Sequence, residues 1–359
     1  MSRRRTHAPD IPLCLVLSVK ASDDAHKTLK ALHQHGLLHQ IARMQLITTI
    51  TSHPPDAFIQ FISGPLLEAL FGADRMRTLT LMCFNDQDAL GYIADSIRSR
   101  DSDAAIWSDM EQLIIDCFSP KPRFRLRDVW DILAAAPAVA HLAFTTRHGS
   151  RITNTFFNQV GTLAPLPALK SVRGGWDVLI AAAIAAHGLE RIDLWEKAHA
   201  HHLQHPDPGS SHPGSLQHVT SFTEHHHFMP RDWLIKLKEP MIRLRDIQLP
   251  LNMESADGEN ELFLALMDIP PTGGCLRSIT IAPESYSENE DLTTEVAITL
   301  RILSRIEQIG DGRLRGLRQL RFSPQDRFSE HAVNFEERAT IFGALKQWIK
   351  SRRVSLQVI

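Results

Sequence analysis

Residues 110–117, MEQLIIDC, carry the pattern that decides the fold of this chain of 359 residues. Met110, Leu113 and Ile115 are apolar; two variable residues follow Met110, and one, Ile114, follows Leu113. The alternation that starts at Leu113 is typical of a short, half-buried strand. Similar triplets of apolar residues return along the whole chain. The middle apolar residue of each copy, called the anchor below, is at position 15, 44, 79, 113, 142, 172, 192, 219, 247, 279, 320 or 354.

The segments between the anchors have the spacing of helices. Residues 291–309 are the clearest case, since Val296, Leu300 and Leu303 share one helical face and Gly310 follows as a stop signal. Segments of the same kind are predicted at residues 25–40, 57–71, 127–136, 177–187, 230–238, 259–267 and 335–350. The chain therefore alternates between a short strand and a helix about every 31 residues, slightly more than the 20–29 residues of leucine-rich repeats.

This alternation predicts parallel strands, because parallel neighbours need a long and usually helical connection. A doubly wound sheet is the less favoured arrangement, since its strands are buried on both faces and are continuously apolar. We expect one irregular leucine-rich-repeat-like solenoid (a horseshoe) of about twelve strand–helix units over residues 1–359, an α/β fold with parallel strands on the concave face and helices on the convex face. The alternative is another α/β fold in which apolar triplets occur by chance.

Composition and charge narrow the class of protein. The formal net charge is −2, which argues against a dedicated nucleic-acid-binding protein. The longest early apolar run, residues 13–19, is far too short to cross a membrane. The four cysteines are distant from one another in sequence, so free thiols in an intracellular protein, cytoplasmic or nuclear, are expected.

Histidines are the most conspicuous candidates for metal chemistry. Many lie in residues 198–227, among prolines, glycines and serines. This composition predicts a flexible loop between repeats at residues 197–216, and no H-E-x-x-H motif is present. No metal site is expected, and a metal-dependent enzyme built on this segment remains the less favoured alternative.

Other catalytic signatures are missing from the sequence. The glycine-rich residues 310–316 follow a predicted helix and precede a predicted strand, whereas a phosphate-binding loop has the reverse order. No phosphate-binding P-loop, nucleophile elbow or protein-kinase signature is found. We therefore expect a protein without enzymatic activity and without a cofactor.

The positions between the anchors are the candidates for binding. They point away from the helices, and in the central strands they include an arginine and a tryptophan, which dominate many binding interfaces. Trp195 is the first candidate, although a tryptophan packed against a neighbouring loop is equally compatible with the sequence. The predicted protein-binding residues are Gln112, Asp116, His141, Arg191, Asp193, Trp195, Asp246 and Gln248. In the strand anchored at Ile279, Thr280 is expected to face solvent.

Residues 12–18 (PLCLVLS) and 39–46 (HQIARMQL) carry a family resemblance. Together with residues 75–81, 276–281 and 317–322, they resemble the leucine-rich-repeat region of the fungal F-box-like proteins. That resemblance implies a substrate receptor of a ubiquitin ligase. The roughly forty-residue F-box expected before the first strand is not seen in residues 1–11, so docking on a ligase adaptor is not carried over.

The sequence as a whole predicts a scaffold that binds a partner protein through its concave strand face. Neither nucleic acid nor a membrane is expected as a partner. The ubiquitin-ligase receptor is the alternative, with ligase components as partners if an F-box is encoded upstream.

Overall fold

The computed structural model describes residues 12–18, 22–48, 61–83, 89–100, 105–117, 126–146, 165–195, 215–225, 241–251, 257–269, 276–283, 292–310, 312, 314–322, 343, 347, 350 and 355–358. The chain forms two compact units, residues 1–187 (unit 1) and residues 188–359 (unit 2). The predicted loop at residues 197–216 lies outside the described residues except for its last two positions, and so does the predicted helix at 230–238.

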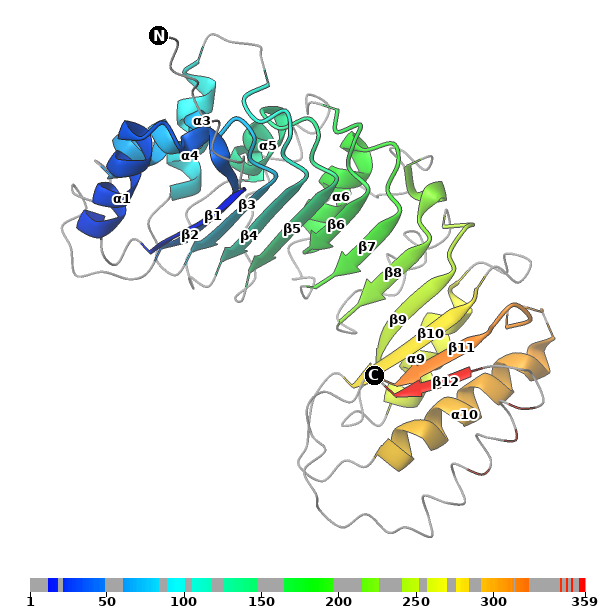
Figure 1. Cartoon of the computed structure of the whole chain (residues 1–359). Helices are drawn as coiled ribbons and strands as arrows, with labels where there is room; N and C mark the ends of the chain where they lie inside the picture. Colours follow the sequence, from blue (N-terminus) through cyan, green and yellow to red (C-terminus); the bar gives the residue numbers. More distant parts are fainter. Residues whose placement is uncertain are drawn as a thin grey trace, which may run out of the picture. The chain divides into compact units, whose positions relative to one another are not determined.

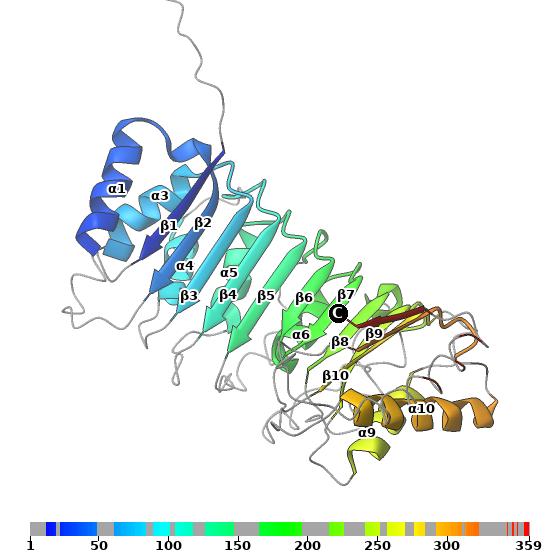
Figure 2. The same ribbon diagram turned by 60° about the horizontal axis from the view of Figure 1, so that its bottom comes forward.

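Unit 1 contains six parallel strands that lie side by side in chain order (Figures 1 and 2). They are β1 (Leu13–Ser18), β2 (Ile41–Thr48), β3 (Thr78–Cys83), β4 (Gln112–Cys117), β5 (His141–Thr146) and β6 (Ser171–Gly174). Helices cover one face of these strands: α1 (Ser22–Gln34), α3 (Leu67–Gly72), α4 (Ala89–Arg98), α5 (Leu126–Ala134) and α6 (Trp176–Ala185), with a 3-10 turn at Leu38–Gln40 and a π-helical turn at Ile62–Leu66. Of these helices, α4 was not predicted from the sequence.

Unit 2 repeats the same scheme. Its strands also follow chain order: β7 (Arg191–Leu194), β8 (Ser221–Glu224), β9 (Asp246–Leu251), β10 (Ser278–Pro283), β11 (Gln319–Phe322) and β12 (Ser355–Val358). The helical elements are a 3-10 turn at Ser215–His218, α9 (Gly258–Met267) and α10 (Leu292–Ile309), which ends at Gly310 with a φ of 73°. This left-handed residue terminates the helix, as its position in the sequence predicted. The predicted open parallel α/β solenoid is confirmed in each unit.

One row of apolar side chains per unit connects the strands to the core. In unit 1 the directly paired residues are Leu15, Met44, Leu79, Leu113, Leu142 and Val172. In unit 2 they are Ile192, Phe222, Ile247, Ile279, Leu320 and Leu356. Ten of these twelve residues are the predicted anchors, and all of those ten except Leu15 of the first strand are buried. The register thus places the anchor of each repeat directly beside the anchor of the following repeat.

Two predicted anchors were wrong. Phe222, not Val219, pairs with Ile192 and Ile247, and Leu356, not Val354, pairs with Leu320. Val219 is fully buried but lies in the turn before β8. At β8 an apolar residue, Val219, stands three positions before the anchor as in most repeats, so this triplet was read one step too early.

A turn of constant geometry precedes most of the strands. In this turn, the residue three positions before the anchor donates its backbone N–H to the carbonyl of the residue three positions earlier in the chain. Examples are Met76 to Ala73 at 3.1 Å, Val139 to Ala136 at 3.1 Å and Val219 to Leu216 at 3.2 Å. The residue two positions before the anchor then donates to its counterpart in the preceding repeat, as Arg277 does to Arg245 at 2.7 Å. These counterparts form what we call the edge row, which in unit 2 consists of Glu190, Thr220, Arg245, Arg277 and Arg318.

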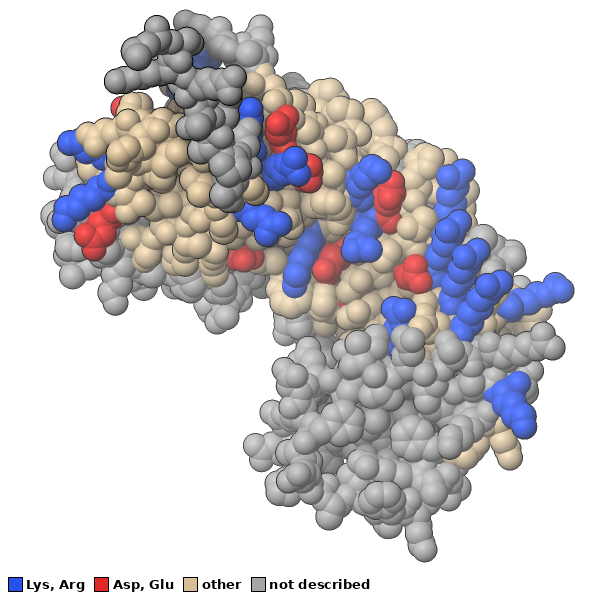
Figure 3. All heavy atoms as spheres, viewed as in Figure 1, with Lys and Arg blue, Asp and Glu red and all other residues tan. Residues whose placement is uncertain are grey.

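The strand side chains that alternate with the buried anchors form what we call the open face. In unit 1 the open-face residues whose burial is described are exposed or half-buried, and most of this face is uncharged in Figure 3. In unit 2 this holds for β7, β8 and the start of β9, but not for β10, where Ser278 and Thr280 are buried. The expectation that Thr280 faces solvent was wrong. Its neighbours in the register, Gln248 and Arg321, have longer side chains only one strand spacing of about 4.8 Å away, and they shield it.

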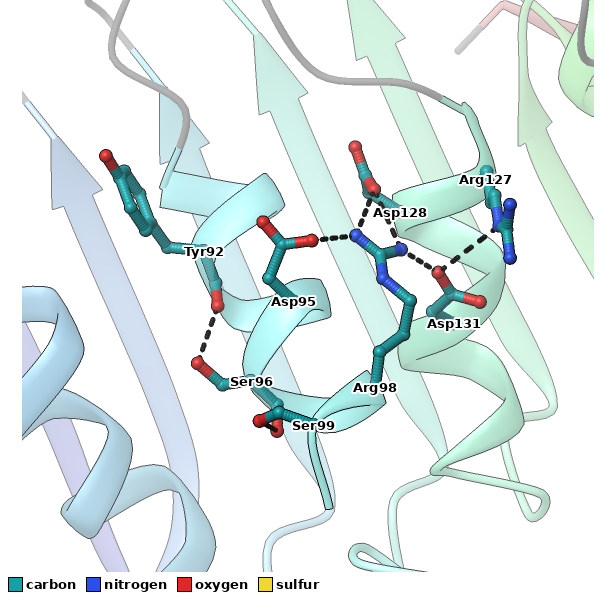
Figure 4. A network of polar contacts seen from close by, with 8 residues as sticks. All are labelled: Tyr92, Asp95, Ser96, Arg98, Ser99, Arg127, Asp128 and Asp131. Atoms are coloured by element: carbon teal, nitrogen blue, oxygen red, sulfur yellow. Dashed lines mark hydrogen bonds and ion pairs between the residues drawn. The ribbon is translucent and has the colours of Figure 1, made fainter. Parts of the chain in front are cut away.

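The helix layer of unit 1 contains a buried carboxylate. Asp128 of α5 is fully buried, and its Oδ1 lies 3.1 Å from Nη1 of Arg98, the last residue of α4 (Figure 4). The same guanidinium also contacts Asp131 of α5 and Asp95 of its own helix. Burial lowers the pKa of Arg98, but the hydrogen bonds to the three carboxylates outweigh this effect and raise the pKa above its ordinary value. Arg98 is therefore a permanent cation that connects two repeats.

Ile114 and Ile115 are adjacent, but only Ile115 is fully buried, whereas Ile114 is half-buried on the open face. We expect Ile115→Ala to lower the free energy of unfolding by about 2–5 kcal/mol, because it leaves a cavity under the strand. Ile114→Ala is expected to cost less than about 1.5 kcal/mol, since less apolar surface leaves the core. Urea unfolding of both variants checks this. Equal losses would show that the two faces of β4 are misassigned.

Arg98→Met is expected to destabilise the protein by about 3–5 kcal/mol, since Asp128 would remain buried without its cation. Asp95→Asn is the control, because Asp95 is mostly exposed and its contact with the same arginine is worth at most about 1 kcal/mol. Thermal and urea unfolding of the two variants measure the difference. If Arg98→Met were as mild as the control, the interaction would not support the packing of α4 on α5.

Candidate functional site

The three predicted binding residues of unit 1 lie on two adjacent strands. Gln112 of β4 and His141 of β5 are direct neighbours in the register, with His141 exposed. Asp116 lies four residues further along β4, where it accepts a hydrogen bond from the Thr145 hydroxyl of β5. The structure therefore brings these residues together on the open face, but the carboxylate of Asp116 is already used within the sheet.

The five predicted residues of unit 2 lie on or next to two strands that flank β8. Arg191 and Asp246 are both exposed and pair with Ser221 from opposite sides. One step along the strands, Asp193 and Gln248 pair with Thr223 in the same way and are half-buried. The strands β7, β8 and β9 thus form a polar surface with the basic Arg191 on one side and the acidic Asp246 on the other.

Trp195 lies at the carboxyl end of β7 and contacts a histidine of the next repeat. Its ring centroid is 4.2 Å from that of His225, with the planes at 64°, which is an edge-to-face arrangement. The Nε2 atom of His225 lies 2.8 Å from Oδ1 of Asp193. Trp195 is half-buried, and the His225 and Asp193 side chains are about one quarter exposed. We call these three residues the Trp195 cluster.

His225 was not selected as a binding residue from the sequence, although a signal for it exists. Trp195 follows its anchor, Ile192, by three positions, and His225 follows Phe222 by the same three positions. The two rings are therefore equivalent residues of adjacent repeats. With the anchor of β8 misplaced at Val219, this equivalence could not be recognised, and His225 was grouped with the histidines of the neighbouring segment.

The Trp195 cluster combines features suited to recognition of a protein. The indole offers a large apolar surface with one N–H donor, and few rotatable bonds are lost when it is buried further. His225 and Asp193 hold one another in place by a hydrogen bond and present partly exposed polar atoms beside the indole.

Metal ligands, cysteines and helix hydrophobicity also bear on the function of the described part of the chain. Among them, no group of three or more histidine, cysteine or acidic side chains is arranged to hold a metal ion. Of the cysteines, Cys14 is exposed and Cys117 is buried, both as free thiols. Within the described part of the chain, no helix is long and apolar enough to cross a membrane.

A cavity of unit 1 lies at the amino ends of β1–β3. Its volume is about 530 Å³, and its lining includes His39, Arg43, Arg75 and Arg77 beside the exposed thiol of Cys14. No carboxylate is among its described lining residues. The cavity therefore presents a cationic surface in unit 1.

Comparisons with known proteins give one solved structure of interest. No family model and no curated protein matches the chain. Similarity was found to the crystal structure of the leucine-rich repeat-containing protein LegL7 from Legionella pneumophila, with 12% sequence identity and a TM-score of 0.41. The alignment covers 82% of this chain and 86% of that chain. The strand register of this chain itself shows the open parallel solenoid.

Proposed function

We propose that this protein is a non-enzymatic scaffold that binds a partner protein through the open face of its strands, with Trp195 as the main contact. The observation that carries the proposal is the half-buried indole, which lies against His225 while Asp193 holds that ring in place. A tryptophan held rigidly by its neighbours, with part of its surface still accessible, is typical of a residue that dominates the affinity of an interface.

The surroundings of Trp195 support a polar rim around this contact. Arg191 and Asp246 are exposed on the same open face, and Thr223 and Gln248 lie between them and the indole along the strands. Interfaces commonly place charged and polar groups around a central aromatic residue. Because the side chains come from adjacent strands with fixed spacing, the surface needs little rearrangement on binding, which favours affinity.

The family resemblance gives the proposal a narrower form, in which the bound protein is a substrate of a ubiquitin ligase. Residues 12–18 and 39–46, which carry the resemblance, lie in and around β1 and β2. The discriminating measurement is co-purification of a ligase adaptor with the protein expressed from its own gene. Absence of the adaptor would reject the narrower form and leave the scaffold proposal standing.

Site-specific photo-crosslinking tests the scaffold proposal. A photoreactive amino acid is introduced at Thr223 on the open face of unit 2, or at Gln308 of α10 as the control, and the protein is irradiated in its own cells. We expect a discrete crosslinked partner from position 223 and not from position 308. A crosslink of equal yield at Gln308 would contradict binding through the open face.

Trp195→Ala in the same protein is expected to abolish this crosslink. Removal of a dominant interface residue costs about 2 kcal/mol or more, which is about a thirtyfold loss of affinity. Ile309→Ala is the matched control, since Ile309 is also an exposed apolar residue of unit 2 but lies on α10. If Trp195→Ala retained the crosslink while remaining folded, Trp195 would not be the main contact.

A further inference from the structure

Five exposed arginines lie at the amino ends of β9, β10 and β11 in unit 2. They are Arg243, Arg245, Arg277, Arg315 and Arg318, and we call them the arginine ridge. Figure 3 shows lysine and arginine side chains gathered over this part of the unit. The ridge lies at the strand starts, whereas the Trp195 cluster lies at the strand ends, so the two are separate surfaces.

The backbone of the repeat fixes three of these arginines in a row. Arg277 donates its N–H to the carbonyl of Arg245 at 2.7 Å, and Arg318 donates to the carbonyl of Arg277 at 2.8 Å. They are equivalent residues of successive repeats, so their Cα atoms follow the strand spacing of about 4.8 Å. The fold therefore holds three guanidinium-bearing residues side by side and leaves them exposed.

The other two arginines extend the ridge at its ends. Arg243 precedes β9 and contacts His218 of the preceding repeat, with 3.5 Å between its Nη1 atom and Nδ1 of the histidine. Arg315 precedes β11 within the turn that ends at Leu317. Asp246, the first residue of β9, is exposed beside Arg245. Among the described residues 241–246, 276–278 and 314–319 at these strand starts, there are five arginines and one acidic residue, Asp246.

An anionic group placed along Arg245 and Arg277 would be attracted by both guanidinium groups at once. Guanidinium groups bind carboxylates through two parallel hydrogen bonds, which makes arginine well suited to recognise an acidic chain. Ile242, directly before Arg243, is about half exposed and offers an apolar contact at the end of the row. We propose that the arginine ridge binds a glutamate- and aspartate-rich segment of a partner protein.

A nucleic acid fits these observations less well than an acidic peptide. Binding of single-stranded nucleic acid commonly uses aromatic side chains on which the bases stack, and the described residues at these strand starts, 241–246, 276–278 and 314–319, include no aromatic residue. Binding of a duplex depends on a broad basic field, whereas this chain has a formal net charge of −2. A short row of arginines next to an exposed isoleucine therefore favours a protein segment.

Fluorescence anisotropy with a fluorescein-labelled oligoglutamate peptide tests the proposal on the full chain. We expect the wild-type protein to bind this probe, and Arg245→Gln/Arg277→Gln to weaken binding about tenfold or more, because two charge-assisted contacts are lost. Binding should also weaken strongly between about 0.1 and 1 M NaCl, as the Debye length falls from about 10 to about 3 Å. Circular dichroism checks that the variant is folded.

Arg43→Gln/Arg77→Gln is the matched control, because these exposed arginines lie on and directly before adjacent strands in unit 1. An equal loss in both double variants would overturn the proposal, since any pair of exposed arginines would then suffice. Tighter binding of an oligothymidylate of equal charge would overturn it in favour of nucleic acid. Trp195→Ala should leave peptide binding unchanged, so this test is independent of the proposed scaffold function.

Discussion

The parallel register between successive strands is the constraint on which the rest of each unit depends. It places one anchor per repeat directly beside the next, as for Leu79, Leu113 and Leu142, and so assembles a core that no single repeat could bury. The alternation of side chains along a strand then assigns every second residue to the open face. The candidate binding residues are consequently ordered by the same interaction that stabilises the fold.

Contacts between the helices are more varied than those between the strands. In unit 1, Arg98 connects α4 to α5 through a carboxylate that is fully buried. The buried Trp107, in the segment before β4, also contacts the helix layer, since it donates its Nε1–H to the carbonyl of Leu70 in α3 at 2.8 Å. In unit 2, Nη2 of Arg301 in α10 lies 2.7 Å from Oε2 of Glu259 in α9. The hydrogen bond to Glu259 raises the pKa of Arg301, and burial lowers it by a smaller amount. Polar pairs of this kind are directional, so they fix how neighbouring helices sit against one another.

The strands were largely predictable from the sequence, because anchors recur with apolar residues at constant offsets. The prediction slipped at β8, where Leu216, Val219 and Phe222 have equal spacing and only strand pairing identifies which residue is the anchor. Helix α4 was not predicted, although Leu90, Ile93 and Ile97 have helical spacing, because the strand triplets alone do not mark a helix. Burial of Thr280 depends on the size of its neighbours in other strands, Gln248 and Arg321, which are distant in sequence.

The candidate site was predicted in part. Asp193 lies on β7 and Trp195 directly follows that strand. Their contacts with His225 depend on the register between β7 and β8, which the sequence alone does not give. The arginine ridge shows the same difficulty, since Arg245, Arg277 and Arg318 are separated by whole repeats in the sequence. Side chains that act together across repeats become recognisable only after every strand has been aligned to its neighbours.

The strict chain order of the strands also bears on how the protein is made. Within each unit, a strand pairs with the strand of the repeat before it and the repeat after it, so pairing partners are separated by only a few tens of residues. Short separations between contacting residues favour rapid folding, because little loop entropy is lost when each contact forms. A unit can therefore grow by adding one repeat at a time as the chain leaves the ribosome, without waiting for a distant segment to complete its core.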